Sequence, residues 1–203
     1  MAGQTRENSQ RTHARIMDVA LELFAAQGVA ATTVTAIEAG AGLAAGSGSF
    51  YRHFPDKSAL LSAVVDRELT RVTKQPTAQL QHPEQRDRPA AEALAVQLRA
   101  DLDFLADLRS LIAILMWERD RAPEIAERVR TLMLERGVEL GVADLLFATP
   151  AEPVSDDPAA AATVMMSAMV GYHLSLEYFG SAPADVGPER FTTTLARLLT
   201  RGR

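Results

Sequence analysis

Cysteine is missing from this chain of 203 residues. Its absence excludes disulfide bonds, thiolate metal sites and a cysteine nucleophile, and it fits a cytoplasmic location. Runs that alternate polar and apolar residues, the pattern of half-buried strands, are almost absent too. Hydrophobic residues make up 47% of the chain, and glycine and proline gather between segments of helical periodicity. The sequence therefore predicts an all-α protein with a substantial core.

Signals for export or membrane insertion are also lacking. Residues 1–15 are polar and do not contain the apolar core of a signal peptide. No apolar run approaches the roughly 20 residues that cross a bilayer. The apolar segment 159–170 is short and gives way to His173 and Glu177. We therefore expect a soluble, cytoplasmic protein.

Features of enzymes are equally sparse. A His173/Glu177 pair lies four residues apart, but one such pair is weak evidence for a metal site without further ligands. The Gly46-Ser47-Gly48 segment follows no predicted strand and precedes no Gly-Lys-Ser/Thr, so it is not a phosphate-binding loop. The four histidines are scattered, with no pair at metal-ligand spacing: His13, His53, His82 and His173. We expect no catalytic residue, no metal and no cofactor.

The formal net charge is −5, which by itself argues against a nucleic-acid binder. The charges are unevenly distributed along the chain, however. Residues 1–75 hold eight Lys/Arg and seven Asp/Glu, whereas the remainder holds thirteen and nineteen. The acidity thus lies outside the first third, although a surplus of one positive charge there is a weak footprint for phosphate binding.

The N-terminal third has the pattern of a helix-turn-helix. After a disordered polar arm (residues 1–9), a first helix is predicted to end at Gly28, which adopts a left-handed cap. Its apolar stripe is Ile16, Val19, Ala20, Leu23 and Phe24. Thr33 is the expected N-cap of a second helix, with Thr35 and Glu38 as a competing capping box. Gly42 makes the turn, and a short third helix over 47–53 can enter a major groove. Phe50 and Phe54 should pack on the first helix.

Five further helical segments follow a fourth helix over 56–74. Loops are predicted over 77–88 and 148–157, where prolines interrupt polar sequence. The helices between and after them are expected over 89–108, 111–118, 123–147, 158–179 and from 188 onward. About nine helices are therefore expected in all.

Residues 10–65 resemble the tetracycline-repressor (TetR) family of bacterial transcription regulators. The matching residues are Leu23-Phe24 with Gly28, Thr33-Val34, Ile37 with Ala41-Gly42-Leu43, Phe50 to Phe54, Lys57 and Leu60-Leu61. One departure is that the segment between Leu43 and Phe50 is two residues longer than the common family pattern, with Ala44 where a Ser or Thr cap is usual. We expect Ser47 to cap the third helix instead, and Gly46 and Gly48 to let the backbone approach phosphate.

The resemblance implies a DNA-binding domain over 1–55 and a ligand-binding and dimerisation domain over 56–203. Base reading is expected from Ser47, Ser49 and Thr35, and phosphate contacts from Tyr51 and Lys57. Alternatively, Tyr51 is an ordinary half-buried aromatic and His53 a packing residue. The complete predicted DNA-binding set is Thr33, Thr35, Ser47, Gly48, Ser49, Tyr51, Arg52, His53 and Lys57.

The second domain is expected to bind a small, mostly apolar effector and to pair with a second copy. Predicted ligand-binding residues are Phe104, Met116, Trp117, Met133, Met169, Tyr172 and His173, each of which could also be ordinary core. Predicted dimerisation residues are Met165, Met166, Val170, Leu174, Phe191, Leu195 and Leu198, and the alternative for their first helix is a wholly buried core helix.

Together these patterns favour a homodimeric regulator that acts as a repressor. It would read palindromic double-stranded DNA with recognition helices roughly 34–36 Å apart. An effector would release it by favouring another conformer, with the helix over 56–74 as the lever because it belongs to both halves. The alternative is a helical module that binds small ligands and does not act on DNA.

Overall fold

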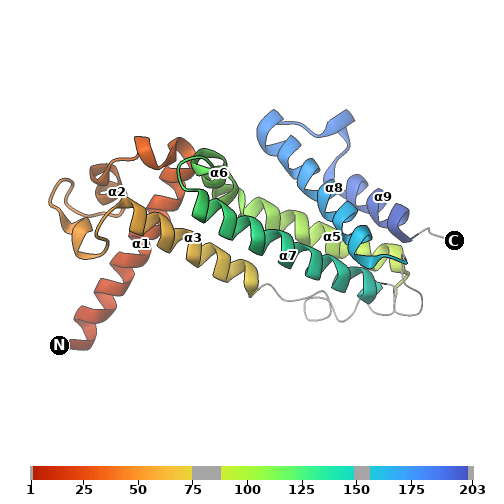
Figure 1. Cartoon of the computed structure of the whole chain (residues 1–203), viewed down its shortest axis with the longest axis horizontal. Coiled ribbons are helices and arrows are strands. Elements are labelled where there is room, and N and C mark those ends of the chain that lie inside the picture. The colour runs from red at the N-terminus through yellow and green to blue at the C-terminus, as the bar shows by residue number, and fades with distance from the viewer. Residues whose placement is uncertain (1, 75–87, 149–155, 201–203) are drawn as a thin grey trace. The chain divides into compact units, whose positions relative to one another are not determined.

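The computed structural model describes residues 2–74, 88–148 and 156–200, and in these ranges it contains helices and no strand. The all-α prediction is confirmed. The N-terminal elements are α1 (Ala2–Ala31), α2 (Val34–Gly40), the 3-10 helix η1 (Ser49–Arg52) and α3 (Lys57–Thr73). They are followed by α5 (Ala90–Asp107), α6 (Arg109–Glu118), α7 (Pro123–Ala148), α8 (Pro158–Phe179), the 3-10 helix η3 (Pro183–Asp185) and α9 (Pro188–Thr200), all labelled or traceable in Figure 1. The predicted loops over 77–88 and 148–157, and with them His82, lie largely outside the described residues.

The chain divides into two compact units that are not consecutive in sequence. Unit 1 consists of Met1–Val72 together with Leu108–Arg130, and unit 2 consists of Thr73–Asp107 together with Thr131–Arg203. Unit 1 therefore contains α6 as well as the helix-turn-helix segment. It extends well beyond residue 55, where the sequence suggests a domain boundary.

Helix α1 supplies the core of unit 1. Ile16, Ala20 and Phe24 of the predicted stripe are completely buried. The helix begins at Ala2, so residues 2–9 continue α1 where the sequence suggests a disordered arm. Gly28 has a positive φ of 75°, as predicted, but its ψ of 165° lies outside the left-handed helical region, and a further turn beyond this kink reaches Ala31. Only glycine tolerates such a backbone angle without strain.

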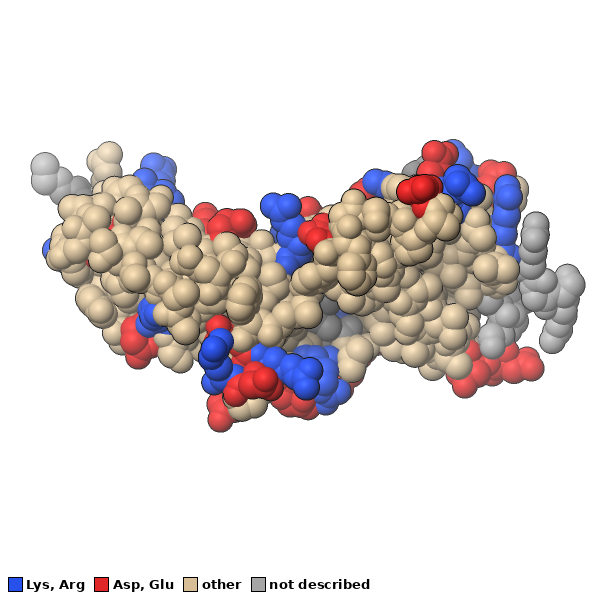
Figure 2. All heavy atoms as spheres, turned by 90° about the horizontal axis from the view of Figure 1, so that it is seen from above, with Lys and Arg blue, Asp and Glu red and all other residues tan. Residues whose placement is uncertain are grey.

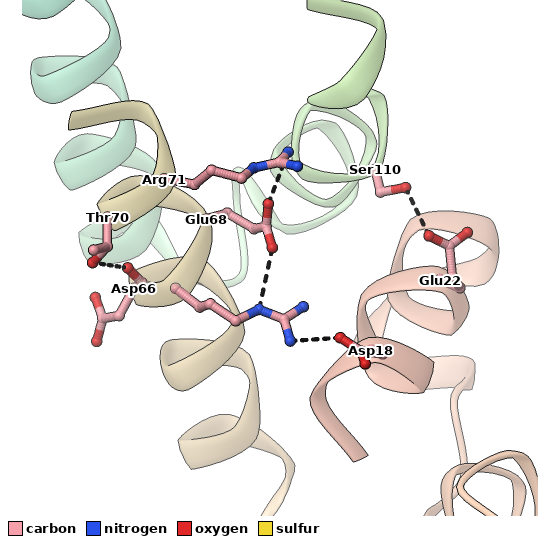
Figure 3. A network of polar contacts seen from close by, with 8 residues as sticks. Asp18, Glu22, Asp66, Glu68, Thr70, Arg71 and Ser110 are labelled. Atoms are coloured by element: carbon pink, nitrogen blue, oxygen red, sulfur yellow. Dashed lines mark hydrogen bonds and ion pairs between the residues drawn. The ribbon is translucent and has the colours of Figure 1, made fainter. Parts of the chain in front are cut away.

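A network of ion pairs joins α1 to α3 (Figure 3). Arg67 Nη1 lies 2.6 Å from Asp18 Oδ1 on α1, and its Nε lies 3.3 Å from Glu68 Oε1. Arg71 Nη2 binds the other Glu68 oxygen at 3.0 Å. Glu68 is buried but shared by two guanidinium groups, so its charge is compensated. This network fixes α3 against α1 inside unit 1.

Unit 2 is built around α5, α8 and α9, with the last part of α7. Its core contains Leu94, Leu98 and Leu102 of α5 together with Met165 and Met169 of α8. The rings of Tyr172 and Phe191 stack at 4.1 Å between α8 and α9, and the Tyr172 hydroxyl donates to Val186 O at 2.8 Å. A Cβ at Gly141 would lie 3.1 Å from the Ala162 Cβ, so α7 and α8 pack closely at that point.

Helix α8 is more apolar than the sequence pattern predicts. Among the described residues it is the one helix long and apolar enough to cross a membrane by length and composition alone, which contradicts the expectation that no run approaches that length. This is weak evidence for a membrane span, because core helices of soluble proteins pass the same test. Only 28% of its most apolar window is buried within the chain, so much of its surface is left uncovered.

Candidate nucleic-acid interface

The second helix of the helix-turn-helix is fixed by a cap and by close packing. Thr33 is its N-cap, as predicted, and its Oγ1 accepts a hydrogen bond from Ala36 N at 3.1 Å. A Cβ at Gly40 would lie only 2.6 Å from Val19 Cγ1, so α2 approaches α1 as closely as a residue without a side chain allows. Ile37 is fully buried, whereas Thr35 is exposed. α2 thus turns its apolar side to α1 and leaves Thr35 available to a partner.

The third helical segment of the helix-turn-helix, here called the recognition segment (residues 47–53), is shorter and more tightly wound than predicted. The sequence suggests a helix over 47–53, but the structure has the 3-10 helix η1, Ser49–Arg52. The residue before it is Gly48, with φ 72°, so Ser47 is not the N-cap residue and the predicted cap position is wrong by one. Ser47 still takes part, because its Oγ accepts from Ser49 N at 3.3 Å and lies 2.7 Å from Ser49 Oγ. The two serines therefore form one small exposed polar group.

Three side chains at the end of this segment have different surroundings. Tyr51 is 59% exposed, and Arg52 is exposed without an ion pair to any described residue. His53 lies near α1, with its ring centroid 6.1 Å from that of His13. Burial lowers the pKa of His53 below its usual value, and the nearby His13 and Arg52 lower it further. Tyr51 and Arg52 are therefore free to reach a phosphate, while His53 favours its neutral form.

Lys57 occupies an unexpected position. Its ammonium group donates to the carbonyl oxygens of Val29 at 2.7 Å and Thr32 at 2.6 Å, with a longer hydrogen bond to Ala30 at 3.4 Å. An ammonium has three hydrogens, so these three carbonyls use its full donor capacity. Lys57 therefore holds the end of α1 to the start of α3, and a phosphate could bind it only by displacing one of these bonds.

Helix α6 holds the same end of α1 from another side. Glu118 Oε1 accepts from Val29 N at 2.9 Å, and Trp117 Nε1 donates to Ala25 O at 3.0 Å. The Trp117 ring also lies against Gly28, where a Cβ would be 3.6 Å from ring carbons. The kink at Gly28 is thus held by both α3 and α6, and neither interaction is visible in the periodicity of the sequence.

Glu38 has a different role from the one that its sequence position suggests. A capping box with Thr35 would place its side chain at the surface, but only 1% of the residue is exposed. Its carboxylate accepts hydrogen bonds from Gly46 N at 2.7 Å and Phe50 N at 3.0 Å. A charged residue among the apolar positions of α2 was the only sequence signal for this role.

The predicted ligand-binding residues do not come together in one unit. Met116 and Trp117 belong to unit 1 and are exposed, whereas Phe104, Met169, Tyr172 and His173 belong to unit 2. The side chain of Met133 lies outside the described residues. Met169, Tyr172 and His173 are buried on α8, and burial lowers the pKa of His173 although Glu177 opposes this effect.

The predicted dimerisation residues are divided between core and surface. Met165 and Leu195 are buried in the core of unit 2, and Phe191 is half-buried against Tyr172. Met166, Val170 and Leu174 are half-buried as well, whereas Leu198 is 67% exposed. The surface left open on α8 instead carries residues outside the predicted set, such as Val164 and Gly171.

Charged side chains are sparse around the helix-turn-helix. Figure 2 shows few of them on the visible face at the left end of the picture, the end at which Figure 1 places α2. This agrees with the near balance of charges among residues 1–75. A nucleic acid would therefore meet a small number of specific donors rather than a broad basic surface.

Comparisons with known proteins agree with this geometry. A family model described as bacterial regulatory proteins, tetR family, matches residues 16–64, which run from α1 into α3. A stretch of 64 residues is 44% identical to the HTH-type transcriptional regulator AcrR of Shigella flexneri. That match covers 32% of this chain and 29% of the relative, so it spans about a third of either protein or less.

Solved structures extend the likeness of fold to nearly the whole chain. A putative TetR-family transcriptional regulator from Mesorhizobium loti superposes with a TM-score of 0.72 at 19% identity, covering 95% of this chain and 96% of that one. The transcriptional regulator FadR from Bacillus subtilis, solved in complex with stearoyl-CoA, gives a TM-score of 0.61 at 17% identity, covering 94% and 98%. The tetR family model thus matches the helix-turn-helix segment of this chain, and the solved structures share its fold over nearly the whole length.

Proposed function

We propose that this protein is a transcriptional regulator, acting as a repressor, that binds palindromic double-stranded DNA as a homodimer. The observation that carries the proposal is the helix-turn-helix itself, which leaves Thr35, Tyr51 and Arg52 exposed on a unit whose apolar residues are buried. Tetracycline-repressor relatives act by binding DNA and not by catalysis. A cytoplasmic location follows from such a function.

Homodimerisation is supported by the open surface of α8. An exposed or half-exposed stripe runs along this helix at helical spacing and consists mainly of small residues: Ala160, Val164, Ser167, Gly171, Ser175 and Tyr178. Figure 2 looks onto the side of α8 and α9 and shows a largely uncharged surface bordered by charged side chains. Small residues let two helices approach closely, so α8 of a second protomer is the partner expected to pack on this stripe.

The effector is proposed to bind in unit 2 and to be mostly apolar. The buried side chains of α8 include Met165 and Met169, and methionine adapts to irregular apolar shapes. Tyr172 and His173 are the polar groups next to them in sequence. The effector would favour a conformer with a different separation of the recognition segments, weakening DNA binding by its differential affinity for the two conformers. Helix α3 is one lever for this change, and α6 offers a second because it bonds to the end of α1.

The first test is a selection from random duplex DNA, followed by titration of the selected sequence at several salt concentrations. We expect a palindromic winner whose affinity falls in Tyr51→Phe/Arg52→Gln. The slope of log affinity against log salt should decrease by about 1.8 for the dimer, because each of its two protomers loses one phosphate contact, that of Arg52. No enrichment over random duplex, at low salt and without effector, would favour the rival function, a helical module that binds small ligands and not DNA.

A further inference from the structure

The segment between α2 and η1 has little intrinsic order of its own. Gly42, Gly46 and Gly48 all have positive φ angles, of 67°, 74° and 72°. Glycine loses more conformational freedom on folding than any other residue, so three of them within so short a segment make it costly to hold in one shape. The residues Ala44, Ala45 and Ser47 are not buried, so none of them anchors the segment through its side chain. Its internal hydrogen bonds are the one from Ser47 N to Ala44 O at 3.1 Å and those between Ser47 and Ser49, so its position on α2 depends on contacts from outside the segment.

Glu38 supplies the anchor from within α2. One carboxylate oxygen accepts from Gly46 N at 2.7 Å, and the other accepts from Phe50 N at 3.0 Å. The backbone oxygen of the same residue accepts from Leu43 N at 2.8 Å. One residue thus bonds to the segment at Leu43 and Gly46, and to η1 at Phe50 directly after it.

The two bonded amides bracket the positions that would meet DNA bases. Gly46 and Phe50 are the residues on either side of 47–49, which contains the serine pair Ser47 and Ser49. Phe50 is also fully buried, so the end of the segment is held by its side chain as well as by its N–H. The Glu38 carboxylate therefore sets the position and orientation of the two serines relative to α2.

The buried carboxylate of Glu38 depends in turn on the N–H groups that it binds. Only 1% of the residue is exposed, and none of the ion pairs of the described residues involves it. A buried carboxylate needs hydrogen bonds to offset the loss of water, and backbone N–H groups bound to a charged acceptor form strong ones. The carboxylate gives the Gly46 and Phe50 N–H groups their acceptors, and these N–H groups offset the loss of water around the carboxylate, so both favour the same conformation of the segment.

We infer that Glu38 is a positioning residue for sequence reading: it presents Ser47 and Ser49 to the bases without contacting DNA itself. This inference rests on the proposed function of binding DNA. Phosphate contacts by Tyr51 and Arg52 supply affinity for any duplex, whereas base contacts distinguish one sequence from another. Loss of the Glu38 anchor therefore removes discrimination between sequences and leaves general affinity in place.

The test uses Glu38→Gln in the full-length protein, with Glu118→Gln as the matched control. Glutamine keeps the size but has only one acceptor oxygen, and its NH2 would face one of the two N–H donors. Glu118 is also buried and also accepts a backbone N–H, at 2.9 Å from Val29, but it does not bond to the recognition segment. For each variant, the affinities for the selected duplex and for random duplex are measured across salt concentrations.

We expect Glu38→Gln to reduce the ratio of selected to random affinity at least tenfold, with random-duplex affinity and salt slope unchanged. Glu118→Gln should keep the wild-type ratio. An unchanged ratio in folded Glu38→Gln would overturn the inference. If that variant does not fold, Gly46→Ala strains the same segment at φ 74°, with no other atom within 4 Å of the added methyl, and must show the same loss of ratio.

Amide hydrogen exchange separates failure of this inference from failure of the proposed function. Protection of the Gly46 and Phe50 amides should fall in Glu38→Gln and remain in Glu118→Gln, and this readout needs no DNA. If wild-type protein selects no duplex, the proposed function fails and the exchange rates still decide whether Glu38 holds the segment. Unchanged protection of both amides would overturn the anchor itself.

Discussion

Replacing Lys57 by methionine separates two roles that this residue could have. Methionine has a similar length and keeps the packing of the aliphatic stem, but it removes the ammonium group. The structure uses that group to bind Val29 O at 2.7 Å and Thr32 O at 2.6 Å. A hydrogen bond to a charged group contributes about 1.5–3 kcal/mol, and Val29 O can regain water after the substitution while the buried Thr32 is less able to. We therefore expect Lys57→Met to lower the free energy of unfolding by about 2–3 kcal/mol.

The assay is thermal and urea unfolding followed by circular dichroism, without DNA. For a chain of this size the expected loss corresponds to a decrease in Tm of about 4–12 °C. Lys74, the other lysine of the chain, is exposed and makes no hydrogen bond or ion pair with any described residue, so Lys74→Met is the control and should melt like the wild type. If Lys57→Met melts within about 1 °C of the wild type but the DNA salt slope of the dimer falls by about 1.8, the residue is a phosphate contact and the helix-clamping role is refuted.

Three further predictions concern separate parts of the chain. Burial depresses the pKa of His53 below its usual 6.5. The contribution of His53 to the free energy of unfolding is therefore complete above pH 6.5 and is lost as the pH falls through the lowered pKa of the folded state. The urea midpoints measured at about pH 7.5 and about pH 5.5 should differ less in His53→Gln than in the wild type. Gly40→Ala should lower the free energy of unfolding by about 1–3 kcal/mol despite the better helix propensity of alanine, because the added methyl would clash with Val19 Cγ1. The double variant Gly40→Ala/Val19→Ala should recover most of this loss in the same urea titration. Val164→Glu should give a monomer in size-exclusion chromatography with light scattering, because it would bury an unpaired charge in the interface. Met116→Glu is the control and should remain dimeric, since Met116 is 60% exposed and Val164 61%. A dimeric Val164→Glu would show that the α8 stripe is not the interface.

Helical periodicity and caps were sufficient to predict much of the fold. The stripe through Ile16, Ala20 and Phe24 is buried as expected, Thr33 caps α2, and Gly28 has the positive φ predicted for it. These features depend on residues close together in sequence, whose geometry is fixed by the helix repeat and by glycine sterics. Local pattern is therefore a sound guide to where helices lie and which side they bury.

Hydrogen bonds between distant residues were not predictable in this way. Glu118 and Val29 are 89 positions apart, and no periodicity connects a carboxylate on one helix with a backbone amide on another. The same reason explains Lys57, whose sequence position at a helix start suggests a phosphate contact while its ammonium in fact binds carbonyls 25 to 28 residues earlier. The role of Glu38 was not predictable because two hydrogen-bonding schemes were possible for it, and only the fold shows which donors come within reach.

Unit 1 is built from two separate stretches of the chain, and this bears on how the protein could exchange parts with proteins of similar fold. A recombination event or an engineered fusion that transfers residues 1–74 alone would leave α6 behind, with Trp117 and Glu118. The Val29 amide and the Ala25 carbonyl would then lack the partners that hold the end of α1. A working hybrid must therefore bring residues 108–130 along with the helix-turn-helix, or find equivalent partners in the recipient. The helix-turn-helix segment of this protein is thus not a detachable module, and its evolution is tied to a helix encoded far downstream of it.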